Sequence, residues 1–173
     1  FYQYSYSIMM KQLSGDVLTI YYDTTIGVLG LSERDGALCA LFFADKGQEA
    51  DSGRLQETPV LKEAISQIRS YLAGELHTFS VPISETDGTP FQRKVWAALR
   101  DIPYGETRSY KDIAITVDSP QGFRAVGMAN NKNPIAIITP CHRVIGTDGS
   151  LVGYASGLDH KTALLQLEQK YKK

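Results

Sequence analysis

The chain has 173 residues, 43% of them hydrophobic and 21% charged, and its net charge at pH 7 is −1. These values are ordinary for a globular protein and leave room for one sizeable domain or two small ones. They argue against a membrane span, because no run of about 18 apolar residues exists, and two cysteines about a hundred residues apart predict no disulfide framework.

The two cysteines and the first residues bear on the cellular compartment. Cys39 and Cys141 favour a reducing, intracellular compartment, cytoplasmic in a prokaryote or nuclear in a eukaryote. The opening FYQYSYSIMM has no basic leader before an apolar stretch, so it predicts no signal peptide.

The charges are distributed unevenly along the chain. Residues 1–90 carry six Lys or Arg and twelve Asp or Glu, whereas residues 91–173 carry twelve Lys or Arg and seven Asp or Glu. The basic second half suits a polyanion, although charge asymmetry alone is weak support.

The first half predicts strands followed by a helix. Asp35-Gly36 is a hairpin signal, and Cys39 in the strand after it is expected to be a packed small hydrophobe. The runs rich in β-branched and aromatic residues predict strands at 16–22, 26–32 and 37–43.

A helix should follow these strands. Thr58 and Pro59 are typical of a helix start, and Gly74 is typical of a helix end. The segment SVPISETDGTP, residues 80–90, has the composition of a linker. We therefore predict two domains, residues 1–88 and residues 89–173.

The second half predicts mainly helices, with Ser109 as the cap of the second one. The expected ranges are 90–102, 110–117, 123–132 and 160–173. The two middle helices are short and joined by the tight turn DSPQG, which is typical of a helix-turn-helix that offers its later helix to DNA. A plain helical hairpin is the commoner alternative.

Two further features follow the helix-turn-helix in the chain. The apolar run IAIIT, residues 135–139, predicts a short buried strand. The last helix is expected to bury Ala163, Leu164, Leu167 and Tyr171.

The segment PCHRVIG, residues 140–146, places a cysteine beside a histidine. Neighbouring side chains do not normally face each other, so Cys141 and His142 need a sharp turn or a bridging water to exchange a proton. A histidine base also needs a partner for its second nitrogen, and Glu168 is the candidate. Taken alone, Cys141 fits a structural role as well as a reactive one, and a Glu in this position is more often solvated.

Several motifs occur together and in order over residues 89–169. They are PYGETRSY with Tyr110, RAVG at 124–127, NP eight residues before the cysteine, PCHRVIG, and GYASGLDHKTALLQLE. This set resembles the O6-alkylguanine-DNA alkyltransferases, the methylated-DNA–protein-cysteine methyltransferase family. The first half shows only a compatible strand–helix pattern.

The resemblance implies a DNA repair protein that moves the alkyl group of O6-alkylguanine to its own cysteine and leaves open whether O4-alkylthymine is also a substrate. Cys141 would be the nucleophile, His142 would activate it through a water, and Glu168 would orient the imidazole. Tyr110 would protonate the departing guanine, and Asn133 would pin the turn beneath the active site. The thioether product has no built-in route to cleavage, so the protein would act once.

The resemblance also implies surfaces for DNA and for an extruded base. Arg124 would fill the gap left in the duplex by base flipping. The expected DNA-binding residues are Ser109, Gly122, Phe123, Arg124, Ala125, Gly127 and Arg143, with Ala129 as a further small residue on the DNA-reading helix. The expected pocket wall consists of Val152, Gly153, Tyr154, Ala155 and Ser156. In two places the chain departs from the family. Phe123 stands where a small residue is usual and would either wedge into the groove or turn into the core, and Ala155 replaces a Ser that bonds the base in some members.

The implied fold is α/β (α+β). It combines an N-terminal ribonuclease-like domain, with a small antiparallel sheet and a helix, and a mainly helical, winged-helix-like C-terminal domain. Some members bind a structural zinc in the first domain, but Cys39 and His77 are the only Cys and His before residue 90, so no metal is expected. No cofactor is expected either, and the partner would be double-stranded DNA containing alkylated guanine, bound by a monomer.

Two other functions stay open. A lesion-binding protein without catalysis would require an inert Cys141, and a cysteine hydrolase using the same Cys-His-Glu set would turn over repeatedly on an ester or peptide. A plain helix-turn-helix transcription factor would leave that set without a purpose. Modification of Cys141 by an alkylated oligonucleotide, once per protein, would separate these functions.

Overall fold

The computed structural model describes residues 17–45, 47–50 and 58–173. The chain divides into two compact units, residues 1–85 and 86–173. The domain boundary expected between residues 88 and 89 stays a prediction. The opening segment, for which the sequence predicts no signal peptide, lies outside the described residues, as does Asp16 at the start of the first expected strand.

The first unit is built on a three-stranded antiparallel sheet in the order β1-β2-β3. Its strands are β1 (Leu18–Thr24), β2 (Gly27–Arg34) and β3 (Ala37–Phe43). Asp35 and Gly36 have φ angles of 53° and 79°, the left-handed conformation that a two-residue hairpin turn requires. The three expected strands and this hairpin are confirmed, with ends that differ by one or two residues.

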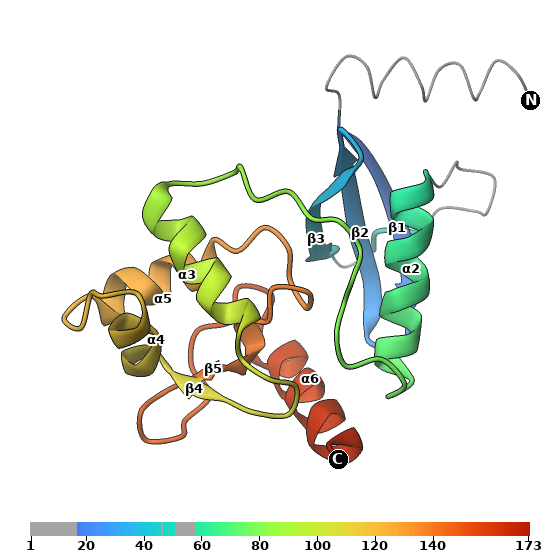
Figure 1. Cartoon of the computed structure of the whole chain (residues 1–173). Coiled ribbons are helices and arrows are strands. Elements are labelled where there is room, and N and C mark those ends of the chain that lie inside the picture. The colour runs from blue at the N-terminus through green and yellow to red at the C-terminus, as the bar shows by residue number, and fades with distance from the viewer. Residues whose placement is uncertain (1–16, 46, 51–57) are drawn as a thin grey trace, which may run out of the picture. The chain divides into compact units, whose positions relative to one another are not determined.

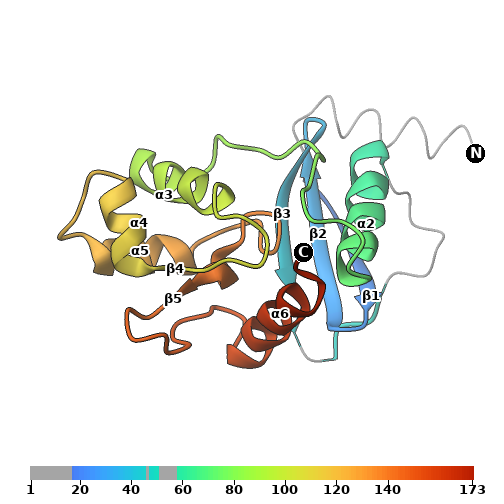
Figure 2. The same ribbon diagram turned by 60° about the horizontal axis from the view of Figure 1, so that its bottom comes forward.

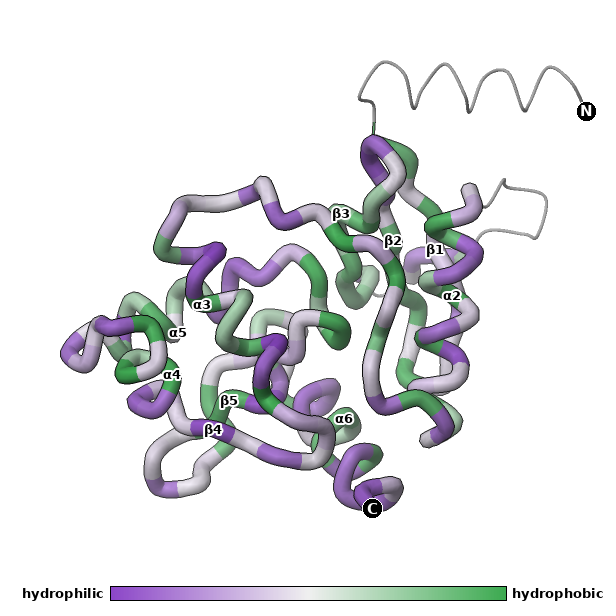
Figure 3. Tube along the Cα trace, in the orientation of Figure 1, coloured by the Kyte–Doolittle hydropathy of each residue, from purple (hydrophilic) through white to green (hydrophobic). Residues whose placement is uncertain are grey.

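Helix α2 (Pro59–Leu72) lies along one face of this sheet, as Figures 1 and 2 both show. The side chain of Thr58 accepts a hydrogen bond from the Leu61 backbone N–H, which caps the helix as its sequence predicts. Hydrophobic residues are concentrated along β3 (Figure 3), where Cys39 is buried and its thiol donates to the Ser32 carbonyl. Cys39 is thus a packed core residue, as expected.

The second unit is mainly helical and holds the site residues. Its helices are α3 (Pro90–Arg100), α4 (Tyr110–Thr116), α5 (Phe123–Asn131) and α6 (Leu158–Tyr171), and two short parallel strands, β4 (Arg108–Ser109) and β5 (Val144–Ile145), pair beside them (Figure 1). Thr89 and Ser109 each form a capping box, the first with Gln92 and the second with Asp112. The fully buried core of this unit includes Val95, Leu99, Ala114, Val126 and Val144.

The strand expected at residues 135–139 is wrong. The segment is buried, but it folds as a turn in which Ile137 has a φ of 70° and the Thr139 N–H bonds to the Ile135 carbonyl. The side chain of Asn133 supplies the reason, because it accepts from the Ile135 N–H and donates to the Thr139 carbonyl at 2.7 Å. An apolar run indicates burial, but these local bonds decide the backbone path.

Helix α6 buries a different face from the one expected. Leu164 is buried as predicted, whereas the other three residues are only partly covered. The fully buried positions beside Leu164 are Lys161 and Glu168, both of which have partners inside the unit. Among the described residues, no helix combines the length and the apolar character that a membrane span needs.

Candidate active site

Cys141 begins a one-turn 3₁₀ helix, Cys141–Arg143, that leads directly into β5. Pro140 precedes it with φ −81° and ψ 68°, so the chain bends sharply just before the cysteine. The turn sends the neighbouring side chains to different partners. His142 bonds to Glu168, while the thiol of Cys141, 5% exposed, interacts with Asn133 and Tyr154.

Glu168 is the centre of a buried hydrogen-bond network. Its Oε2 lies 2.7 Å from His142 Nε2, and its two oxygens accept from Arg143 Nε at 2.8 Å and Nη2 at 3.0 Å. The Gly105 backbone N–H adds a further bond of 3.2 Å to Oε1. Burial alone would raise the pKa of Glu168, but the hydrogen bonds and charges of His142 and Arg143 hold it well below its usual value. Glu168 is therefore ionised and fixes the orientation of the imidazole.

His142 is fully buried and is neutral at physiological pH. Burial lowers its pKa below the ordinary value of 6.5, although the Glu168 carboxylate acts in the opposite direction. Nε2 is engaged by Glu168, and Nδ1 has no partner among the described protein atoms. The geometry thus leaves one ring nitrogen available for proton transfer.

The expectation that Arg143 contacts DNA needs correction. Arg143 is 6% exposed, and its guanidinium is directed inward, where it forms the bidentate pair with Glu168 and donates to the Ile102 carbonyl at 2.7 Å. A side chain held by these bonds cannot reach a phosphate at the surface. Arg143 instead holds Glu168 in place from inside the unit.

Burial raises the pKa of the Cys141 thiol, while the Asn133 side chain and the charge of Lys161 lower it in part. The thiol therefore needs a base at neutral pH, since only the thiolate is a good nucleophile.

Lys161 and Asn130 are the residues that sequence reasoning missed. Lys161 Nζ is fully buried and donates to the carbonyls of Val144 at 2.6 Å and Val152 at 2.9 Å, so it ties the loop before α6 to β5. Asn130 donates from its side-chain amide to the Cys141 carbonyl at 3.3 Å. Lys161 had a signal in the sequence, because residues 161, 164 and 168 share one helical face. Asn130 had none.

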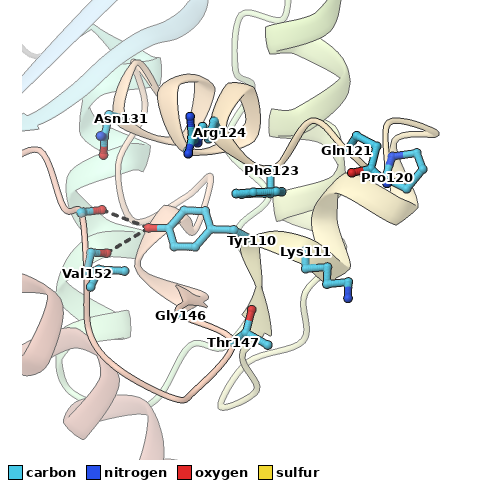
Figure 4. A pocket seen from close by; sticks show the side chains of 12 residues that line it. Tyr110, Lys111, Pro120, Gln121, Phe123, Arg124, Asn131, Gly146, Thr147 and Val152 are labelled. Carbon is cyan, nitrogen blue, oxygen red and sulfur yellow. Dashed lines mark hydrogen bonds between the residues drawn. The ribbon is translucent and has the colours of Figure 1, made fainter.

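Tyr110 is the first residue of α4 and lines a cavity of about 680 Å³. Its hydroxyl donates to the Val152 carbonyl at 2.9 Å and lies 3.3 Å from the Gly153 carbonyl (Figure 4). Burial raises the pKa of Tyr110, and the negative charge of a nearby Cys141 thiolate raises it to a lesser extent. The hydroxyl therefore keeps its proton at neutral pH. Tyr110 thus keeps its hydroxyl proton, lines the cavity and packs against the buried cluster that contains Cys141.

Some of the residues expected to bind DNA or to form the pocket wall line this cavity, but others do not. Phe123, Arg124 and Gly127 line one wall, and Val152 and Gly153 line the other. The remaining expected residues do not line this cavity. Gly122 and Ser109 are the cap residues that precede α5 and α4, and Tyr154 packs against the core. The Ser156 carbonyl accepts from His160, and Ala125 and Ala155 are exposed. Ala129, expected on the DNA-reading face, is buried instead, with its carbonyl bonded to Trp96 Nε1.

Replacing Asn133 by Ala should lower the free energy of unfolding by about 1–3 kcal/mol, because the Ile135 N–H and the Thr139 carbonyl each lose a partner. It should also raise the pKa of the Cys141 thiol further, because the Asn133 hydrogen bond that lowers it is lost. Urea unfolding and the pH dependence of thiol alkylation would measure the two effects. Asn131→Ala, at the exposed last residue of α5, is the control, and equal effects in both variants would contradict the assigned role.

Two family models match the chain in succession. Residues 17–84 match the ribonuclease-like domain of 6-O-methylguanine DNA methyltransferase, and residues 90–170 match its DNA-binding domain. The methylated-DNA–protein-cysteine methyltransferase of Methanosarcina barkeri is 47% identical over 155 residues, which cover 87% of this chain and 98% of that protein. The constitutive one of Bacillus subtilis is 46% identical, with coverages of 85% and 92%.

Solved structures show the same likeness. The crystal structure of Mycobacterium tuberculosis O6-methylguanine methyltransferase matches with a TM-score of 0.79 and 44% identity, over 91% of this chain and 95% of that one. A structure of the M. tuberculosis protein in complex with DNA matches with a TM-score of 0.77 and 44% identity, over 87% and 92% of the two chains.

Proposed function

The chain belongs to the 6-O-methylguanine DNA methyltransferase family, and from that premise we propose that it repairs DNA by moving the alkyl group of O6-alkylguanine to Cys141. Alkyl transfer to a protein cysteine is the function of this family. The observation that supports Cys141 as the acceptor is the buried network at its side, in which His142 is held by an ionised Glu168.

The first step is loss of the thiol proton. A water bridges the Cys141 thiol and His142 Nδ1, so the proton passes to the imidazole and the thiolate forms. Glu168, 2.7 Å from Nε2, stabilises the resulting imidazolium. A buried thiol whose pKa is raised needs this help at neutral pH.

The second step is displacement at the alkyl carbon. The thiolate sulfur forms a bond to that carbon as the bond from carbon to guanine O6 breaks, and the departing guanine takes a proton from Tyr110. The Tyr110 hydroxyl now donates to the Val152 carbonyl, so the incoming base must replace that carbonyl as its acceptor. The product is a thioether, and no group within the described part of the chain is placed to cleave it, so each molecule acts once.

Intact mass after mixing with an O6-methylguanine duplex tests the proposal. The expected result is one methyl group per protein, located on the peptide that contains Cys141, with no further gain in excess substrate. An unmodified protein that still binds the lesion would make the chain a recognition protein. Repeated turnover on an ester or a peptide would favour a cysteine hydrolase.

The role of His142 predicts a characteristic pH profile. Burial raises the pKa of Cys141 and lowers that of His142, so the proton passes from the thiol to a neutral imidazole. The rate of alkyl transfer should therefore not vary with pH around neutrality, and it should decline only below the ordinary histidine pKa of 6.5. In His142→Gln the thiolate must form by loss of a proton to solvent, so the rate should rise about tenfold per pH unit until the raised thiol pKa is reached.

Single-turnover rates from about pH 5 to about pH 9 would show the difference. His77→Gln, a substitution in the first unit, serves as the control and should keep the flat profile. A flat profile in His142→Gln would show that the imidazole is not the proton acceptor.

Residues 90–170 are the DNA-binding domain of the family, so DNA is the partner of the second unit. We propose that the DNA is double-stranded and carries an alkylated guanine, that the protein binds it as a monomer, and that it works in the cytoplasm of a prokaryote or the nucleus of a eukaryote. The expectation of no metal and no cofactor stays a prediction. The described residues contain no cluster of three His, Cys, Asp or Glu side chains suited to a metal ion.

A further inference from the structure

The aromatic side chain of Phe123 has no part in the chemistry described above. It is the first residue of α5, and its ring is 47% exposed. The ring does not turn into the core, which was one of its two expected positions, but lines the same cavity as Tyr110 and Arg124. A single exposed apolar residue is common, so its position in the cavity is what calls for an explanation.

The cavity has two ends. At one end the Tyr110 hydroxyl meets the Val152 carbonyl, and the Tyr110 side chain packs there against the buried cluster that contains Cys141. Phe123 lies on the other side of Tyr110, next to Pro120 and Gln121 (Figure 4). If the proposed function holds, a base that reacts with Cys141 occupies the first end, and the Phe123 end is then the one toward the duplex from which that base comes.

Positive charge accompanies the ring. Lys111 and Arg124 line the cavity together with Phe123. The ammonium group of Lys111 suits a phosphate that flanks an extruded nucleotide, and Arg124 is the residue expected to fill the gap in the duplex. Apolar side chains inserted between base steps unstack them, and an aromatic ring stacks on any base because every base has a π-face. The combination of ring and charges matches the surroundings of a flipped nucleotide.

We propose that Phe123 is a second wedge beside Arg124, and that its ring stacks on the duplex base that loses its neighbour when the alkylguanine is extruded. This inference rests on the proposed function. The ring replaces the lost stacking partner and so favours the extruded state. It contributes to opening the duplex and not to the chemistry at Cys141.

The test compares Phe123→Ala with Met128→Ala on three substrates. Met128 is a matched control, because it is an apolar residue of the same helix, 68% exposed, and lies outside the cavity lining. The substrates are an O6-methylguanine duplex, the same strand unpaired, and the free base O6-benzylguanine, which needs no extrusion. The readout is the single-turnover rate of Cys141 modification.

Phe123→Ala should react about tenfold more slowly with the duplex, in line with the loss of one base–aromatic stack. Its rates with the unpaired strand and the free base should not change, which would also show that the variant is folded. Phe123→Trp should restore the duplex rate, and Met128→Ala should match the unsubstituted protein on all three substrates.

An unchanged duplex rate in Phe123→Ala would overturn the proposal, and so would an equal loss on all three substrates, which would place the ring in the base pocket. Failure of the unsubstituted protein to be modified by any of the three substrates would instead overturn the proposed function. The two ideas can therefore fail separately.

Discussion

Replacement of Cys141 by Ala is expected to abolish alkyl transfer completely while the fold and the binding of methylated DNA persist. The thiolate of Cys141 is a far better nucleophile toward an alkyl carbon than the neighbouring imidazole of His142, which is held by Glu168. No neighbouring side chain is therefore expected to substitute for it. Removing one sulfur atom from a side chain that is 5% exposed should cost about 1 kcal/mol of stability. Intact mass after incubation with an O6-methylguanine duplex would show no added methyl group.

Cys39→Ala is the matched control. It removes the other thiol of the chain, which is also buried but lies in β3 of the first unit. This variant should still gain one methyl group per protein. If Cys141→Ala still gained a methyl group, the acceptor would have been assigned to the wrong residue. The same conclusion would follow if Cys39→Ala gained none while the unsubstituted protein was methylated.

Replacement of Glu168 by Ala is expected to have the largest effect on stability. The substitution leaves the Arg143 guanidinium buried without its countercharge and removes the acceptor of His142 and of the Gly105 N–H. Loss of one partner of a buried ion pair typically costs about 3–5 kcal/mol. Urea unfolding would measure this loss, and the transfer rate of the remaining folded protein should fall by about a hundredfold, because His142 is no longer oriented.

The exposed pair of Arg108 and Glu106 supplies a matched control. Its charged atoms are 3.6 Å apart and its side chains are 39% and 43% exposed, so Glu106→Ala should cost less than about 1 kcal/mol. A similar loss of stability in both variants would contradict the assignment of a special role to the buried network.

Glu168→Gln tests the same network through pH. The folded protein holds the pKa of Glu168 below its ordinary value of 4.5, so the carboxylate stabilises the fold fully above that pH and loses this contribution as the pH falls toward the lowered pKa. The glutamine variant should therefore be less stable near neutral pH and lose less stability on acidification. Urea midpoints across the acid range would show whether the two curves converge.

Features that depend on neighbours in the chain could be predicted from the sequence. Thr58, Thr89 and Ser109 cap helices because their side chains bond to a backbone N–H three residues further on. Asp35-Gly36 forms the hairpin because these residues tolerate positive φ. The order and spacing of the motifs around PCHRVIG were also sufficient to indicate the family, which the comparisons confirm.

Only the tertiary structure decided where the polar side chains of the site lie. Arg143 faces inward and Lys161 is buried because their partners come from segments far away in the chain: Glu168 and Ile102 for the arginine, Val144 and Val152 for the lysine. The turn at residues 135–139 likewise depends on the Asn133 side chain and not on the apolar pattern. A sequence shows which residues favour burial, but the free energy of a buried charge depends on its partners, and the fold alone brings those together.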